Sequence, residues 1–222
     1  QMEQFQGFSP QTYDFLIRLA FNNNKQWFEE HRAEYKEFVQ KPALLMEREL
    51  SEAALRIDPR FRVGRYALSR INRDTRFSKN KDPYRDHFWI GYRHPETRNS
   101  ECFGLFFDLH PGSYGYGMGL YCPQKEFMDA FRTKALARPA ELLRIVTEPE
   151  LTALLELGGQ DYRRTLPGFE GLPEELQPYI QKRFFYLERQ NSDIERTYRR
   201  ELLHEVIHAF ELMAPLYHFA QN

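Results

Sequence analysis

The sequence predicts an α+β fold: a single domain with an antiparallel sheet and hairpin core, flanked by N- and C-terminal helices. Apolar residues recur at helical spacing in the first quarter of the chain and again after residue 124. The middle of the chain alternates in the manner of strands. Because the helices flank the strands in sequence, one α+β domain over residues 5–220 is favoured over alternating βαβ units.

Three helices are expected in the first quarter. Ser9-Pro10 provides an N-cap followed by proline at the first helical position. Helical spacing then continues to the asparagines at 22–24, a natural stop. A second helix is expected over about 25–39. Pro42 opens a third, which ends at Asp58-Pro59.

The middle of the chain predicts three strands. Residues 87–92 form the first of them. Residues 102–110 and 114–122 are expected to pair as a hairpin around the loop Pro111-Gly112-Ser113.

With a three-residue loop, two residues of the hairpin lie opposite each other when their numbers sum to 224. Leu105 would then face Gly119, and Phe107 would face Gly117. Large side chains would fill the space that the glycines leave. This packing explains the alternating glycines better than a nucleotide loop does, because they do not match G-x-G-x-x-G.

Helices return in the last part of the chain. The capping boxes Thr147-x-x-Glu150 and Ser192-x-x-Glu195 each predict a helix start, and Gly158-Gly159 predicts a helix end. The expected elements are helices over about 125–137, 140–146, 150–157 and 174–182, a strand over 184–187, and a final long helix to about Met213.

Membrane and secretory features are missing from the sequence. No run of about 18 apolar residues occurs, and the first residues lack the charged and apolar regions of a signal peptide. Cys102 and Cys122 are too few for a disulfide framework or a cysteine-rich zinc site. They face each other in the expected hairpin, which would allow a disulfide. Reduced thiols in the cytoplasm are favoured.

Basic residues are concentrated in one segment. Residues 59–98 contain eleven basic and four acidic residues, a net charge of +7, which leaves −8 for the rest of a chain that totals −1. The densest part is 70–85. Converging arginines would form an anion site, because the planar guanidinium suits phosphate or carboxylate. The alternative is a solvated loop in which Asp74, Asp82 and Asp86 pair with neighbouring arginines.

At this segment the chain resembles the Domain of Unknown Function 2461 family of bacterial and fungal conserved hypothetical proteins. The resemblance covers nearly the whole chain. Its blocks are Phe21-Asn22-Asn23-Asn24-Lys25-Gln26-Trp27-Phe28 with His31-Arg32 and Tyr35, Arg73-Asp74-x-Arg76-Phe77-Ser78-Lys79-x-Lys81-x-Pro83-Tyr84, Pro167-Gly168-Phe169 with Lys182, and Pro215-Leu216-Tyr217-x-Phe219.

The resemblance implies no established activity and no cofactor. It does imply that the polar blocks 22–35 and 73–85 are hallmarks of the family, and core packing alone explains such residues poorly. We expect the two blocks to meet and form one concave, positive surface for a phosphate-bearing small molecule or a nucleic acid. The expected ligand-binding residues are Asn23, Trp27, Arg70, Arg73, Asp74, Arg76, Lys79 and Lys81.

The segment His204-Glu205-Val206-Ile207-His208 supports an alternative, a metal-dependent hydrolase. In H-E-x-x-H, two histidines one helical turn apart bind zinc, and the glutamate acts as general base. Ala214 stands where a metzincin has its third histidine. Helical phasing also places both histidines on the solvated side. We therefore expect no metal here. A third possibility is a structural or adaptor protein whose cations form only internal ion pairs.

Overall fold

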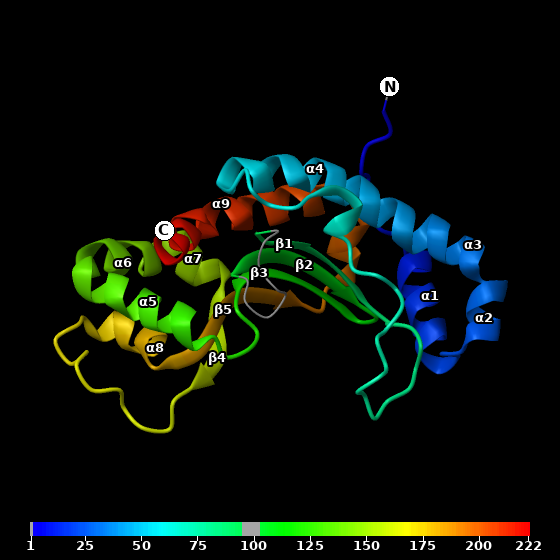
Figure 1. The fold of residues 1–222 in the computed structure, drawn as a ribbon. Helices are drawn as coiled ribbons and strands as arrows, with labels where there is room; N and C mark the ends of the chain where they lie inside the picture. The colour runs from blue at the N-terminus through cyan, green and yellow to red at the C-terminus, as the bar shows by residue number, and fades with distance from the viewer. Residues whose placement is uncertain (1, 95–102) are drawn as a thin grey trace. The chain divides into compact units, whose positions relative to one another are not determined.

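A five-stranded antiparallel sheet with N- and C-terminal helices packed on it forms the framework of the computed structural model (Figure 1). The structure describes residues 2–94 and 103–222. The strand order is β1-β2-β3-β5-β4. The predicted α+β class is therefore confirmed.

The chain divides into two compact units. Unit 1 comprises Gln1–Tyr92, Phe106–Gly115 and Gln190–Ile207. Unit 2 comprises Arg93–Leu105, Tyr116–Arg189 and His208–Asn222. The strands β2, β3 and β5 contribute residues to both units, since the boundaries fall within them.

Helices fill the first quarter of the chain, as expected. Asn24 caps α2, because its side chain accepts a hydrogen bond from Trp27 N at 2.9 Å. The helix expected over 25–39 is divided at His31, where the backbone leaves helical geometry (φ −114°, ψ 11°). The elements are α1 Pro10–Phe21, α2 Lys25–Glu30, α3 Arg32–Tyr35, a π-helical turn Lys36–Gln40 and α4 Lys41–Ile57.

The expected hairpin is present, but its loop is shorter than predicted. Strand β2 spans Gly104–His110 and β3 spans Ser113–Gly119, so the loop is the pair Pro111-Gly112. In a hairpin with a two-residue loop at 111–112, residues whose numbers sum to 223 would lie opposite each other. The register of 224 assumed a third loop residue, and that loop length was wrong. Cys102 lies outside the described residues, so the cysteine pairing does too.

Two glycines of β3, Gly115 and Gly119, give room to residues of β5. A Cβ atom on Gly115 would lie 2.4 Å from the side chain of Gln190. A Cβ atom on Gly119 would lie 2.4 Å from Tyr186, and Gly119 also has φ +152°. The packing explanation therefore holds for these two glycines, with a different neighbouring strand.

The remaining strands are β1 Phe88–Tyr92, β4 Glu156–Asp161 and β5 Lys182–Asn191. Strand β4 was missed, because Gly158-Gly159 was interpreted as a helix end. Gly158 instead pairs with Tyr186 of β5, and a Cβ atom on Gly158 would lie 2.3 Å from the tyrosine ring. A large cross-strand neighbour thus explains a glycine that strand propensity disfavours.

The helices of the last part differ from expectation at both ends, and the final helix continues to Gln221, past its expected end at about Met213. Helix α7 is capped by Glu148, which accepts from Leu151 N at 2.8 Å, and not by Thr147. A 3₁₀ turn Ile194–Tyr198 follows the Ser192 box, so α9 begins only at Glu201. The helices are α5 Lys125–Ala137, α6 Pro139–Val146, α7 Pro149–Leu154, a 3₁₀ turn Glu174–Leu176, α8 Gln177–Ile180 and α9 Glu201–Gln221.

Aromatic clusters form the core of each unit. In unit 1 the ring of Phe8 lies 6.1 Å from Phe107 and 5.6 Å from Phe88. In unit 2 the ring of Phe185 lies 5.1 Å from Phe131 and 5.4 Å from Tyr179. Among the described residues, no helix combines the length and apolar character that crossing a membrane requires.

Candidate functional site

We call residues 70–85 the basic loop; it is the long teal loop that precedes β1 in Figure 1. Main-chain contacts close its base. Asn72 and Tyr84 form an antiparallel bridge, and Arg73 N donates to Pro83 O at 2.9 Å. Arg85 N donates to Ile71 O at 2.8 Å. The chain between these residues is thus tied at both ends.

Asn23 clamps this base from outside. Its amide Nδ2 donates to Tyr84 O at 2.8 Å, and its Oδ1 accepts from Tyr84 N at 3.0 Å. The buried Tyr84 ring also stacks on Phe28, with centroids 4.1 Å apart. The two polar blocks of the sequence therefore meet in space, which confirms that part of the prediction.

The other polar residues of the first block have local contacts. Asn22 donates to Arg18 O at the end of α1, at 2.9 Å. The ring of Trp27 stacks on His31 with centroids 4.0 Å apart, and His31 Nδ1 lies 2.7 Å from Trp27 O. Trp27 is half-buried in this arrangement, also beside Phe15 at 5.7 Å. These contacts show that Trp27 and His31 pack against each other and against the neighbouring helix residues.

Three cations of the basic loop donate hydrogen bonds to main-chain carbonyl groups within it. These bonds hold the loop in shape and leave the positive charges in place, since a carbonyl oxygen is a dipole and not a counter-ion. The bonds run from Arg73 Nη1 to Asp82 O (3.0 Å), from Lys81 Nζ to Thr75 O (2.8 Å) and from Arg85 Nη1 to Arg70 O (2.6 Å).

Arg76 is the loop cation with a carboxylate partner. Its Nη2 lies 2.7 Å from Asp74 Oδ2, and the two side chains are 77% and 57% exposed. Hydrogen bonds from Arg76 lower the pKa of Asp74 to about 2. The pair lies in solvent, where such contacts contribute little to stability.

Arg70 and Lys79 are exposed. Within residues 2–94 and 103–222, no hydrogen bond or ion pair joins either cationic side chain to the protein. Phe77, between Arg76 and Lys79, is 95% exposed, and the guanidinium carbon of Arg76 lies 5.7 Å from its ring centroid.

The family model described as "Conserved hypothetical protein (DUF2461)" matches residues 11–219. The chain belongs to this family. Comparison with curated proteins found none that matches this DUF2461 protein. The matched region includes both polar blocks and the whole of the basic loop.

The HEVIH segment of the DUF2461 protein lies in α9, with both histidines exposed as phasing predicted. Glu205 faces other partners: Tyr114 Oη donates to it at 3.2 Å, and Arg196 Nη2 lies 3.3 Å from it. His208 Nε2 lies 3.2 Å from Glu150. In the described part of the chain, no group of three or more histidine, cysteine, aspartate or glutamate residues is arranged to hold a metal ion.

A cluster of titratable groups in unit 1 has no signature in the sequence. The imidazole rings of His87 and His110 stack with centroids 4.6 Å apart. His87 Nδ1 lies 2.9 Å from Asp86 Oδ1, and His110 Nε2 lies 3.7 Å from Asp108 Oδ2. The nearby carboxylate of Asp108 raises the pKa of His110. Only the paired strands bring these residues together, so no sequence motif reveals them.

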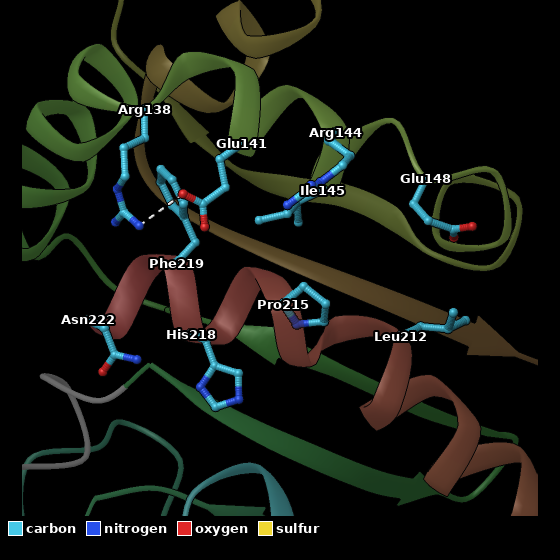
Figure 2. A pocket seen from close by; sticks show the side chains of 10 residues that line it. All are labelled: Arg138, Glu141, Arg144, Ile145, Glu148, Leu212, Pro215, His218, Phe219 and Asn222. Carbon is cyan, nitrogen blue, oxygen red and sulfur yellow. Dashed lines mark hydrogen bonds and ion pairs between the residues drawn. The ribbon is translucent and has the colours of Figure 1, made fainter.

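Unit 2 contains a depression of about 480 Å³ between α6 and α9 (Figure 2). Arg138 pairs there with Glu141 at 3.0 Å and lies over the Phe219 ring at 4.6 Å. Glu148, at its edge, caps α7. None of the eight predicted ligand-binding residues lines this depression. Charged groups of the depression thus form an ion pair with each other, as Arg138 and Glu141 do, or cap a helix, as Glu148 does.

Proposed function

We propose that this DUF2461 protein binds a phosphate-bearing anion through the outward side of the basic loop. One observation carries the proposal: among the described residues, Arg76 alone of the six loop cations has a carboxylate partner, and main-chain carbonyl groups hold Arg73, Lys81 and Arg85 in place. Residues 70–85 contain six basic residues and two carboxylates. Of these, Arg76 and Asp74 form an ion pair.

The hydrogen bonds to carbonyl groups support a preformed positive surface. Arg73, Lys81 and Arg85 use some of their donors to organise the loop, and they keep their full charge. The summed field of such fixed cations raises the local concentration of anions. A preorganised site also loses less entropy on binding than a mobile one.

Arg70 and Lys79 are the residues assigned to the ligand, with Arg76 beside them. The first two have free donors for phosphate oxygens. Arg76 can exchange its exposed carboxylate partner for a phosphate at little cost, since both members of the pair lie in solvent. In this proposal Asn23 supports the loop, Trp27 packs within the first polar block, and neither contacts the ligand.

Tripolyphosphate, compared with sodium chloride at equal ionic strength, tests the proposal. The melting temperature of the wild type should rise with tripolyphosphate, because a ligand that binds the folded state stabilises it. Isothermal titration should show an affinity at least about tenfold weaker for the variant Arg70→Ala/Lys79→Ala, through loss of charge-assisted bonds.

A matched control removes the same charge elsewhere. Arg163 and Arg164 are exposed residues of unit 2. The variant Arg163→Ala/Arg164→Ala should keep the wild-type affinity. An equal loss of tripolyphosphate affinity in both double variants would mean that the effect comes from the net charge of the protein and not from the basic loop. No stabilisation of the wild type by tripolyphosphate would favour a structural or adaptor role for the loop.

A further inference from the structure

We infer that the anion held by the basic loop is the backbone of a single-stranded nucleic acid, and that Phe77 stacks on one of its bases. This inference rests on the proposed function and names the class of ligand. It starts from Phe77, which is 95% exposed in the midst of the loop's cations. Arg76 lies next to the ring at 5.7 Å, and Lys79 follows two residues later.

Proteins that bind single strands combine two features, cations along the backbone and aromatic rings on which bases stack. The basic loop has both within a few residues of one another. A phosphate-binding site for small inorganic anions has no use for an exposed phenyl ring. The phenyl ring instead suits a ligand that carries a planar apolar group close to its phosphates, as a nucleotide chain does.

A second aromatic–cation contact lies just before the loop. Tyr66 is 72% exposed, and the guanidinium carbon of Arg62 lies 3.9 Å from its ring centroid. Both residues belong to the +7 segment. In the sequence, aromatic and basic residues are thus interleaved from residue 62 to residue 79, a pattern typical of proteins that bind single strands.

Single strands fit this surface better than a duplex does. In a duplex the base faces are stacked on each other, so Phe77 would find no partner. Duplex binding also depends on many phosphate contacts, whereas this chain has a net charge of −1, and its excess of positive charge is concentrated in residues 59–98. A short contact of few phosphates and an unstacked base matches the small basic area.

The contacts that close the two ends of the basic loop keep the Phe77 ring exposed to solvent. The bridge between Asn72 and Tyr84 and the clamp by Asn23 tie both ends of the chain that carries Phe77. A rigid aromatic side chain loses little conformational freedom on binding. Substitution at Phe77 should therefore alter binding without altering the fold.

Fluorescence anisotropy tests the inference. The probe is a labelled oligothymidylate of about 12 nucleotides, a length within the range that single-strand-binding proteins usually cover. Phe77→Ala should weaken binding about tenfold or more, and Phe77→Trp should restore it, because base stacking on an aromatic ring is lost and regained. Phe21→Ala is the matched control: Phe21 is 85% exposed but lies outside the basic loop, so binding should be unchanged.

Tripolyphosphate separates this inference from the proposed function. Phe77→Ala should bind tripolyphosphate as the wild type does, whereas Arg70→Ala/Lys79→Ala should lose both ligands. In the double variant the salt dependence of oligothymidylate binding should also fall, by about 0.7 in logarithmic slope for each phosphate contact removed. Wild-type protein that binds neither ligand would end both proposals.

Other results would overturn the inference alone. Tripolyphosphate binding with no loss of oligothymidylate affinity in Phe77→Ala would show that the ring is not used. A duplex of equal length bound as tightly as the single strand would assign recognition to phosphate alone. Binding to vesicles of phosphatidylserine and phosphatidylcholine, with no binding of oligothymidylate, would make the loop a membrane contact instead.

Discussion

Arg73 in the basic loop and Arg132 in unit 2 do the same chemical task in opposite surroundings. Each donates hydrogen bonds to main-chain carbonyl groups: Arg73 to Asp82, and Arg132 to Ile180 and Lys182. Arg132 is buried, with a side chain only 4% exposed. Arg73 belongs to a loop whose neighbouring cations lie in solvent.

This difference teaches that burial determines what an ordered cation can do. A buried guanidinium must spend its donors on the protein, because an unpaired buried polar group is costly. A cation at the surface can hold a loop and still present charge to a ligand. Arg132 therefore belongs to the framework, whereas the cations around Arg73 keep their charge at the surface.

The largest effect is expected for Arg132→Ala. The substitution leaves the carbonyl groups of Ile180 and Lys182 without their donor and opens space inside unit 2. We expect the free energy of unfolding to fall by about 3–5 kcal/mol, as when one partner of a buried polar contact is removed. Urea unfolding measures it. Lys125→Ala, which removes an exposed partner of Asp129, should leave stability nearly unchanged.

Asn23→Ala tests whether the basic loop depends on its clamp. The variant loses both hydrogen bonds to Tyr84, and we expect a loss of about 1–3 kcal/mol in unfolding free energy. Faster limited proteolysis within residues 70–85 should accompany it. The control Asn22→Ala removes one exposed bond at the end of α1. Equal effects from the two variants would contradict the clamp.

Glu47 extends the comparison to a buried acid in unit 1. Its carboxylate accepts from Gly64 N at 2.8 Å and from Tyr92 Oη at 3.4 Å, and burial raises its pKa above the ordinary 4.5. A raised folded-state pKa stabilises the protein below the unfolded pKa, and this contribution is lost as pH rises through the folded value.

Glu47→Gln should therefore become more stable relative to the wild type as pH rises from about 4 to 8, the range above the ordinary carboxyl pKa. Urea unfolding of both proteins across this range measures the difference. A pH-independent difference would mean that burial does not alter the ionisation of Glu47.

Arg76→Ala should have the smallest effect on stability. Both members of the Arg76–Asp74 pair are exposed, so we expect no measurable change in melting temperature in buffer without phosphate. Differential scanning fluorimetry measures this. A clear loss of stability would mean that the pair holds the loop, and the contrast with Arg132 would then weaken.

The candidate site was predictable in outline and not in the roles of its residues. Charge segregation indicated the loop, and the family blocks indicated that residues 22–35 meet it. The sequence could not distinguish Asn23 from Asn22 or Asn24, although one clamps Tyr84, one closes α1 and one caps α2. Identical side chains acquire different roles because the chain presents them to different main-chain groups.

Local signals in the sequence were sufficient to predict the helices α1 and α5 and the strand β1. They also predicted that His204 and His208 are exposed. Caps, apolar period and charge act over a few residues, so the sequence expresses them directly. Only the tertiary structure revealed strand β4, the neighbours that fill the space beside Gly115, Gly119 and Gly158, and the stacked pair of His87 and His110. Each of these depends on which strand lies beside which, and long-range pairing leaves no short-range trace in the order of residues.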